Sequence, residues 1–402
     1  MREVRGFSPL PVFLGLVAGL AGGLVSACYR MMLSEAESFS MHALTGRGAL
    51  SSLALLPLWI AGAVVIGLLM ERAPMARRGG VPRVKDEFAG GPAMNWWRVL
   101  AAKFAAGGLG IALGLSLGRG GPSVQMGAAA GKGVGGLLGA GDEERRLLLA
   151  GGAAAGLSAT FNAPLAGAVF VMEAVAPRSV PAALSALSAS WVAGRLAGGI
   201  FASGPLFSFG GIPAPSAGLL PHYLVLGILC GAAGVLFRRM SAVADSSFER
   251  VPPAWRVIPP ALAALVLARL LPQVLTGGHG MIESIASGGY GLKVLLFLFV
   301  VKLAFTVMCT CSGAAGGLFY PTLAVGAALG ALYAAVASRA GLAQLSQVGF
   351  LMAGMAGLIS SVMRTPATAV ILVAEMAGTG SHLLPAATTS IAALLVSCGG
   401  KW

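Results

Sequence analysis

Two short segments carry the residue types that hold an anion through the protein backbone. They are Gly118–Pro122 (GRGGP) and Gly317–Pro321 (GLFYP), and each interrupts a long apolar run. Glycine lets the backbone come close to a ligand, and proline favours a helix start, where N–H groups have no acceptor within the helix. We therefore expect these two segments, called here the first and second cassettes, to form the two ends of one anion site.

The elements that position such a site must lie in a lipid bilayer. Hydrophobic residues make up 57% of the 402 residues and charged residues 10%, with a mean hydropathy of +0.85. This is too apolar for a soluble domain. Roughly ten to fourteen membrane helices or half-helices are predicted, in one all-α transmembrane domain without a soluble regulatory domain. Apolar stretches begin near Phe13, Ser51, Leu100, Leu147, Pro181, Tyr223, Ile258, Val294, Leu318 and Leu383.

The charge distribution indicates orientation rather than a nucleic-acid partner. The net charge of +13 is scattered over loops without interleaved aromatic residues. Arg2 and Arg5 precede the first span, the expected loop 34–50 has only Arg47, and the loop 71–98 is rich in basic residues. By the positive-inside rule the N-terminus is cytoplasmic. The five cysteines have no zinc-like histidine spacing, so no metal site is expected.

An internal repeat organises the chain. Segment 151–174 resembles segment 353–376, and each has a proline followed nine residues later by a glutamate. The first cassette lies nearly as many residues before segment 151–174 as the second cassette lies before segment 353–376. The chain is therefore expected to have two halves, about 1–205 and about 206–402. In transporters such halves have inverted topology, and their broken helices meet near the bilayer midplane.

Six motifs in order resemble the CLC chloride channel and transporter family over essentially the whole chain. They are GRGGPSVQMG (118–127), GDE (141–143), GLS (156–158), FNAPLAG (161–167), SGAAGGLFYP (312–321) and GGK (399–401). The resemblance implies a CLC-type fold, a homodimer with one pore per subunit, and monovalent anions passing in single file. It also implies an integral multi-pass protein of the bacterial inner membrane. No cofactor is implied, and chloride is the transported ligand.

The resemblance also assigns the anion-binding residues. At the central position the donors are the backbone N–H groups of Leu318 and Phe319. At the outer position they are the N–H groups of Arg119, Gly120 and Gly121. Amides and helix ends carry partial charges, which attract an anion and still release it.

Two departures from the family pattern concern protons. The family usually has a glutamate, which gates the pathway and carries the proton in exchangers, where this chain has Gly120. The internal proton glutamate of many exchangers falls at Ala174. Neither residue can carry a proton. We therefore expect passive, proton-uncoupled transport of chloride and other monovalent anions by a channel or uniporter.

Two alternatives to uncoupled transport remain. One is a proton-coupled exchanger that uses a different acid, such as Glu173. The other is an intramembrane enzyme. An enzyme would need a nucleophile facing a base, and the predicted broken helices carry no Ser/His or Cys/His pair. The protein is therefore not expected to be an enzyme.

Two further departures concern hydroxyl groups at the central position. The family's serine motif corresponds to Arg78-Gly79-Gly80-Val81-Pro82, with Gly79 at the serine and Gly80 beside it. A tyrosine of the family's last helix would lie beyond Trp402. When hydrogen-bond donors are missing from the site, weakly hydrated anions lose less binding free energy than chloride does. We expect the pore to tolerate or prefer nitrate- or thiocyanate-like anions.

Three side chains near the cassettes have roles that the sequence leaves open. The Tyr320 hydroxyl could donate to an anion, or its ring could fill the space left by the missing glutamate. Lys103 and Lys302 lie in apolar stretches, where an unpaired cation is costly. They match basic positions of the family and could raise the potential along the pore. Alternatively, they snorkel to an interface or pair with Glu173 or Glu375.

Overall fold

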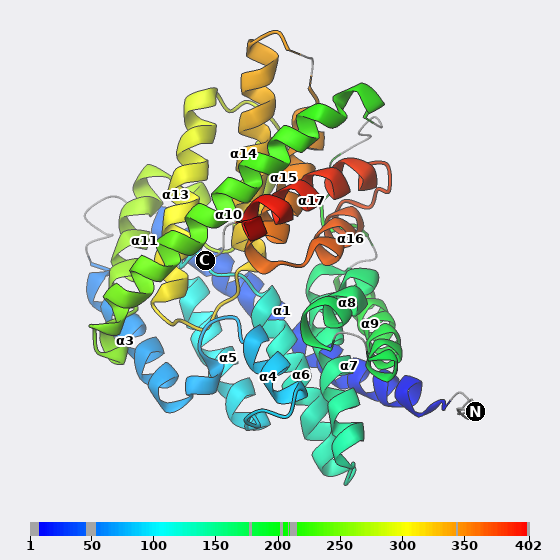
Figure 1. Ribbon diagram of the computed structural model, residues 1–402. Helices are drawn as coiled ribbons and strands as arrows, with labels where there is room; N and C mark the ends of the chain where they lie inside the picture. Colours follow the sequence, from blue (N-terminus) through cyan, green and yellow to red (C-terminus); the bar gives the residue numbers. More distant parts are fainter. Residues whose placement is uncertain are drawn as a thin grey trace. The chain divides into compact units, whose positions relative to one another are not determined.

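The protein is described by a computed structural model that covers residues 8–45, 54–176, 179–201, 204–207, 209, 215–342 and 345–399. The basic residues Arg2, Arg5 and Arg47, the expected span start at Ser51 and the end of the GGK motif lie outside these ranges. Within them the secondary structure is helical and contains no β-strand (Figure 1). The predicted all-α class is confirmed.

The chain forms two compact units built from interleaved segments. One unit combines the chain up to Cys28 with Val81–Leu100 and Ser123–Ser203, and the other combines Tyr29–Gly80, Ala101–Pro122 and the chain from Gly204 onward. Their α-helices are α1 (Leu10–Thr45), α3 (Leu56–Arg72), α4 (Val81–Phe88), α5 (Trp96–Ala112), α6 (Gly120–Leu137), α7 (Asp142–Phe161), α8 (Pro164–Phe170), α9 (Val180–Phe201), α10 (Leu220–Glu249), α11 (Ile258–Leu270), α12 (His279–Ala286), α13 (Leu292–Cys311), α14 (Phe319–Arg339), α15 (Gln347–Met363), α16 (Pro366–Ala377) and α17 (Leu383–Gly399). Short helical turns are η1 (Pro74–Ala76), η2 (Val171–Val175), η3 (Ala217–Leu219), η4 (Pro253–Trp255) and η5 (Pro272–Val274).

Five helical segments in the described ranges are long and apolar enough to cross a membrane. They are Leu10–Thr45, Leu220–Glu249, Pro253–Leu270, Leu292–Cys311 and Phe319–Arg339. Shorter apolar helices include Gln347–Met363 and Leu383–Gly399. Combined with the apolar composition, these segments identify a protein of the lipid bilayer.

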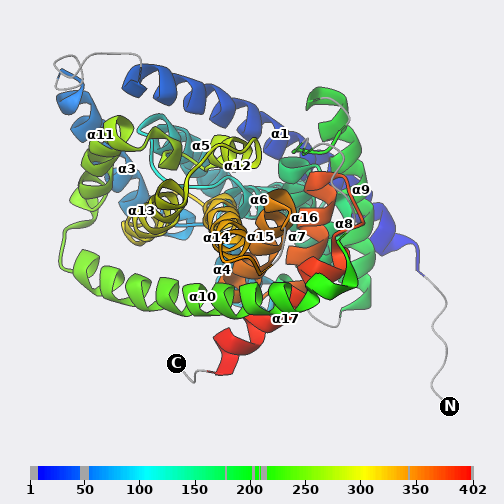
Figure 2. The ribbon, with the colours of Figure 1, turned by 90° about the horizontal axis from the view of Figure 1, so that it is seen from above.

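Glycines allow the helices to pack closely, at matching places in the two repeats. A Cβ atom built on Gly127 of α6 would lie 2.1 Å from the Gly152 oxygen of α7. A Cβ atom on Gly326 of α14 would lie 2.3 Å from the Gly354 oxygen of α15. Backbones this close leave no room for a side chain at these glycines. Such close packing through small residues is typical of membrane helices. In the second unit α10 also packs against α13, α15 and α17 (Figure 2).

The breaks before the repeated prolines have the same backbone geometry. Helix α7 ends in a left-handed cap at Asn162 (φ 51°), and α15 ends in one at Arg364 (φ 58°). The next residue has nearly the same torsion angles in both cases, φ −131° and ψ 77° at Ala163 and φ −127° and ψ 71° at Thr365, and α8 and α16 then begin at Pro164 and Pro366. The internal repeat read from the sequence is therefore present in the structure.

One boundary differs from the prediction. The segment expected as a loop from residue 34 to 50 is helical up to Thr45, because α1 continues for 36 residues. Its polar residues, including Glu35 and Glu37, are therefore held on the same helix as the apolar span. This places the Glu37 carboxylate at a fixed position in the second unit.

Candidate anion-binding site

The two cassettes meet through their first residues. Gly118 N–H donates to the Gly317 carbonyl oxygen, and Gly317 N–H donates to the Gly118 oxygen, both at 2.7 Å. Helix α6 begins at Gly120 and α14 begins at Phe319, two residues beyond this pair. The first N–H groups of both helices thus originate at one place in the second unit, where their partial positive charges favour an anion.

The predicted glycine Gly79 lies at the same place. A Cβ atom built on Gly79 would be 3.6 Å from the Gly317 Cα atom and 3.7 Å from the Gly121 Cα atom. A Cβ atom on Gly317 would be 2.7 Å from the Gly121 nitrogen, which no side chain can tolerate. Three glycines from three separate segments therefore bring bare backbone together. The cassettes were expected to lie together, and Gly79 was placed beside them by the family resemblance.

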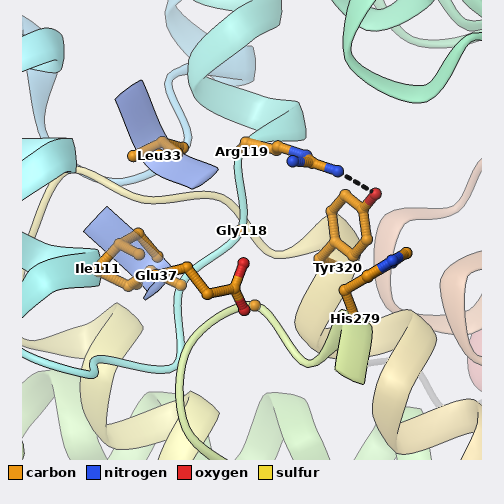
Figure 3. Close-up of a pocket in the computed structure, with 9 residues that line it drawn as sticks. Leu33, Glu37, Ile111, Gly118, Arg119, His279 and Tyr320 are labelled. Carbon is orange, nitrogen blue, oxygen red and sulfur yellow. Dashed lines mark hydrogen bonds between the residues drawn. The ribbon is translucent and has the colours of Figure 1, made fainter. Parts of the chain in front are cut away.

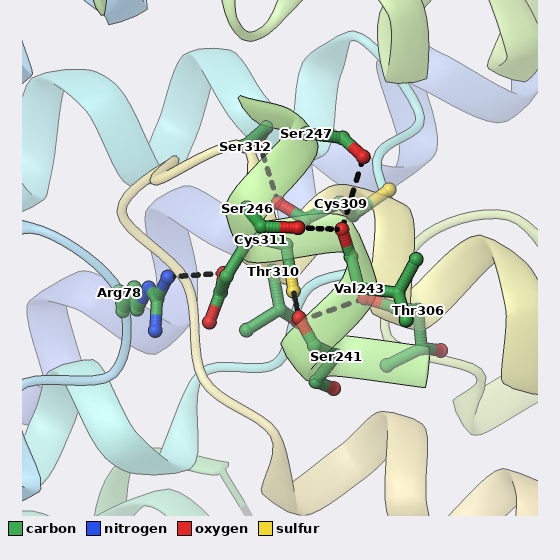
Figure 4. Close-up of polar contacts among 11 residues, drawn as sticks. Arg78, Ser241, Val243, Ser246, Ser247, Thr306, Cys309, Thr310, Cys311 and Ser312 are labelled. Carbon is green, nitrogen blue, oxygen red and sulfur yellow. Dashed lines mark hydrogen bonds and ion pairs between the residues drawn. The ribbon is translucent and has the colours of Figure 1, made fainter. Parts of the chain in front are cut away.

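The loop that carries Gly79 is fixed through the preceding residue, Arg78. Arg78 is in the left-handed region (φ 58°), and its N–H donates to the Ala314 oxygen at 3.2 Å. Its carbonyl accepts a hydrogen bond from the buried Lys103 ammonium group. Its guanidinium forms an ion pair with Asp245 of α10 (Figure 4). Lys103 thus neither snorkels nor pairs with Glu173 or Glu375, and those alternatives are wrong.

Lys302 holds a second loop in the same way. Its ammonium group donates to the carbonyl oxygens of Val274 and Thr276, both at 2.8 Å, and the side chain is fully buried. Thr276 is also left-handed (φ 53°), and its N–H donates to the Gly114 oxygen at 3.2 Å. Snorkelling and carboxylate pairing are therefore wrong for Lys302 too.

The two lysine-held loops are repeat counterparts. Arg78-Gly79-Gly80 leads into α4, and Thr276-Gly277-Gly278 leads into α12, and both helices have eight residues. The second glycine is left-handed in each loop, with φ 82° at Gly80 and 96° at Gly278. Sequence reasoning missed the second loop. One signal was available. The pair Gly277-Gly278 lies about as far along the chain from Gly79 as the second cassette lies from the first.

A small cavity lies at the second loop and is called here the Glu37 pocket (Figure 3). Its volume is about 20 Å³, enough for about one water molecule. The Glu37 carboxylate accepts a hydrogen bond from the Thr276 hydroxyl. The pocket is lined by Leu33, Glu37, Ile111, Leu117, Gly118, Arg119, Gly277, His279 and Tyr320. Glu37 was not among the predicted site residues, because its segment was expected to be a loop.

Arg119 and Tyr320 contact each other in the wall of the Glu37 pocket (Figure 3). The guanidinium donates to the Tyr320 hydroxyl at 2.6 Å and lies 4.7 Å from the centre of its ring. The Tyr320 side chain is buried, so its ring does fill space beside the cassettes. Two buried nitrogen atoms of the pocket walls, Arg119 Nε and His279 Nδ1, have no hydrogen-bond partner among the described residues.

His279 is half-buried between aromatic rings. It stacks on Phe207 with ring centres 4.9 Å apart and meets Tyr320 edge-on at 6.1 Å. Burial, with the nearby charges of Arg119 and Arg30, lowers the pKa of His279 to about 4. The imidazole is therefore neutral at physiological pH, and the positive charge of the pocket wall comes from arginine.

The other predicted site residues occupy the expected segments. Gly120 and Gly121 form the first turn of α6, and Leu318 is the N-cap residue that precedes α14. Phe319 opens α14 and is fully buried. Ala174 lies in the single π-helical turn η2.

Glycine backbone and two helix N-termini gathered inside a helical membrane protein define an anion-transport protein of the bilayer. The chain belongs to the voltage gated chloride channel family, whose pattern it matches over residues 61–398. It is 34% identical over 98% of its length to a Vibrio cholerae protein named H(+)/Cl(-) exchange transporter ClcA, covering 87% of that protein. A Citrobacter koseri protein of the same name is 32% identical over 99% of this chain and 88% of its own length.

Solved structures give the same fold. A slow cyanobacterial Cl-/H+ antiporter superposes with a TM-score of 0.92 at 27% identity, covering 98% of this chain and 96% of that one. A CLC-type fluoride/proton antiporter superposes with a TM-score of 0.78 at 22% identity, covering 96% and 95%, and supports the fold alone. The CLC-type fold with two inverted repeats is therefore confirmed.

The prediction of passive, proton-uncoupled transport is wrong. It rested on the lack of carboxylates at Gly120 and Ala174, whereas the relatives that cover nearly the whole chain are named as proton/chloride exchangers. An uncharged residue at these two positions is evidence about those positions only, since another carboxylate can carry a proton. The names of these relatives give chloride as the anion, which leaves the expected preference for nitrate or thiocyanate without support.

Proposed function

We propose that this protein exchanges chloride for protons across a lipid bilayer. The observation that carries the proposal is the likeness to a named exchanger at 34% identity over 98% of the chain. The similarity to a solved Cl-/H+ antiporter, with a TM-score of 0.92, supports it. The transported ligand is chloride, and the relatives are transporters rather than enzymes.

The anion is held by backbone rather than by a full side-chain charge. The proposed donors are the N–H groups of Leu318 and Phe319 at the central position and of Arg119, Gly120 and Gly121 at the outer position. Gly79 and Gly80 complete the central position. The support for this assignment is the convergence of Gly79, Gly121 and Gly317, where helix N-termini supply partial positive charge.

In this proposal the chain is a variant without the family's gating glutamate. Gly120 stands at that position and Ala174 at the internal proton position, so the exchanged proton is carried by a different acid. Lys103 and Lys302 add positive potential near the pathway, each through the loop that it holds.

The remaining assignments follow from the family. The functional unit is a homodimer of single transmembrane domains with one pore per subunit, in the bacterial inner membrane with a cytoplasmic N-terminus. Each domain has a first half of about 1–205 and a second half of about 206–402.

A flux assay tests the coupling. The full chain is reconstituted into phosphatidylethanolamine–phosphatidylglycerol liposomes with high internal chloride, and potassium with valinomycin fixes the voltage. Chloride efflux should drive protons inward against a pH gradient, so that the bath becomes more alkaline until a protonophore is added. Chloride efflux without proton movement would overturn the proposal.

A further inference from the structure

We infer that Glu37 is the acid that takes up and releases the exchanged proton. This inference rests on the proposed proton-coupled exchange and names the residue that performs it in place of a carboxylate at position 120. Glu37 lies beside the first cassette, accepts a hydrogen bond from a neutral hydroxyl and faces a water-sized cavity.

Glu37 lies beside the first cassette. Glu37 is the one carboxylate among the nine residues lining the pocket, which also include Gly118 and Arg119, the two residues directly before Gly120. The carboxylate points into the pocket toward Tyr320 and His279 (Figure 3). The carboxylate of Glu37 on α1 thus lies beside the first cassette, whose third residue, Gly120, has no carboxylate.

The two repeats make reciprocal carboxylate contacts. Glu37 of α1 contacts Thr276, and Asp245 of α10 contacts Arg78, so the first helix of each repeat sends a carboxylate to the lysine-held loop of the other repeat. The partners differ in charge. Protonation of Asp245 would remove the charge that pairs with the Arg78 guanidinium. Protonation of Glu37 leaves a hydrogen bond whose direction can reverse, because the Thr276 hydroxyl both donates and accepts.

The groups that face Glu37 are mostly positive or neutral. They are Arg30 on α1, Arg119 before α6, His279 and its partner Glu283 on α12, Lys302 on α13 and Tyr320 on α14. The ionised carboxylate and a chloride carry the same charge. Protonation of Glu37 removes this repulsion and therefore favours binding of an anion beside Arg119. Proton binding to Glu37 and anion binding are thus coupled.

The proton transfer needs no other reactant. A hydronium ion that reaches the pocket gives a proton to a Glu37 oxygen, so that the negative carboxylate becomes a neutral acid and the hydronium becomes a water. The reverse step returns the proton to water. The cavity volume of about 20 Å³ accommodates the one water that this transfer requires.

The test compares three proteins in the liposome assay: the wild type, Glu37→Gln and Glu35→Gln. Glu35 is an exposed acid two residues away on α1 and serves as the matched control. Glu37→Gln should lower the ratio of protons to chloride at least tenfold while chloride efflux continues, and Glu35→Gln should match the wild type. If the wild type moves no protons, the proposed function fails. If Glu37→Gln keeps the wild-type ratio, only the assignment of Glu37 fails.

Two more variants separate proton transfer from a structural role. Should Glu37→Gln abolish both fluxes, Glu37→Asp must restore proton movement, and failure to do so overturns the inference. In Thr276→Val the hydroxyl that donates to the ionised carboxylate is lost, while the side-chain shape is kept. Proton transport should then reach half its maximum at a higher pH than in the wild type. An unchanged pH profile would contradict the assignment.

Discussion

Gly118 and Gly317 exchange two backbone hydrogen bonds at 2.7 Å, and no side chain separates the cassettes that they begin. The pair joins equivalent positions of the two repeats, so that one cassette is fixed directly against its counterpart. A Cβ atom on Gly118 would lie 2.9 Å from the Pro321 ring. The backbone proposed to bind the anion is therefore positioned by close contacts around this pair that exclude side chains.

The space beside Gly79 predicts a gain of chloride affinity. The nearest atoms to a Cβ at this position are 3.6 to 3.8 Å away, which is ordinary contact. Gly79→Ser would add a hydroxyl donor to the proposed central position, worth about 1.5 kcal/mol toward an anion. The chloride dissociation constant should fall about tenfold in titration calorimetry.

Gly79→Ala is the control for this gain, because it adds the same Cβ atom without a hydroxyl. It should bind chloride no more tightly than the wild type. Equal affinity in the serine and alanine variants would show that the anion does not lie beside Gly79.

Replacement of Lys302 should destabilise the fold. Lys302→Met keeps the length of the side chain but leaves the carbonyls of Val274 and Thr276 without their buried donor. A loss of roughly 2–4 kcal/mol is expected. Thermal unfolding in detergent should show a clearly lower midpoint, whereas Lys293→Met, at an exposed position of the same helix, should leave it unchanged. Equal midpoints in the two variants would contradict the role of Lys302 as a loop anchor.

Tyr320 should contribute more through its ring than through its hydroxyl. Tyr320→Phe removes the 2.6 Å hydrogen bond from Arg119 but keeps the cation–π contact, and a loss of about 1 kcal/mol is expected. Tyr320→Ala also leaves a cavity beside the cassettes and should cost roughly 3–5 kcal/mol. Thermal unfolding measures both. A larger loss in Tyr320→Phe than in Tyr320→Ala would reverse this assignment.

Acidification should destabilise the protein through His279. Its folded-state pKa of about 4 lies below the unfolded value of 6.5, so the unfolded chain binds more protons between these values. Stability is therefore lost as the pH falls through this range, by roughly 1–2 kcal/mol given the partial exposure of the ring. Unfolding midpoints between about pH 7 and pH 4.5 should fall less in His279→Gln than in the wild type. The same fall in both proteins would exclude His279 as a cause.

The sequence predicted the elements whose signals are local. Glycine and proline within five residues located both cassettes, and the proline-to-glutamate spacing revealed the repeat. Gly79 was placed by a short motif, and the structure brings it against Gly121 and Gly317. These positions depend on backbone conformation, which neighbouring residue types largely decide.

Contacts between distant segments could not be predicted in this way. Thr276 and Glu37 are 239 residues apart, and their hydrogen bond exists only in the folded chain. The polar residues after Ser34 indicated a loop, although α1 continues through them. The carbonyl acceptors of Lys103 and Lys302 are created by left-handed loops, so reasoning from residue type alone suggested carboxylates or the membrane surface instead.

The reciprocal contacts of Glu37 with Thr276 and of Asp245 with Arg78 constrain biogenesis. A chain synthesised from its N-terminus inserts α1 and the Arg78 loop long before α10 leaves the ribosome. During that interval the guanidinium lacks its counterion, and Glu37 lacks its hydroxyl donor. The ion pair and the hydrogen bond therefore form only after the last of the four segments has been synthesised, so the two repeats complete these loops together.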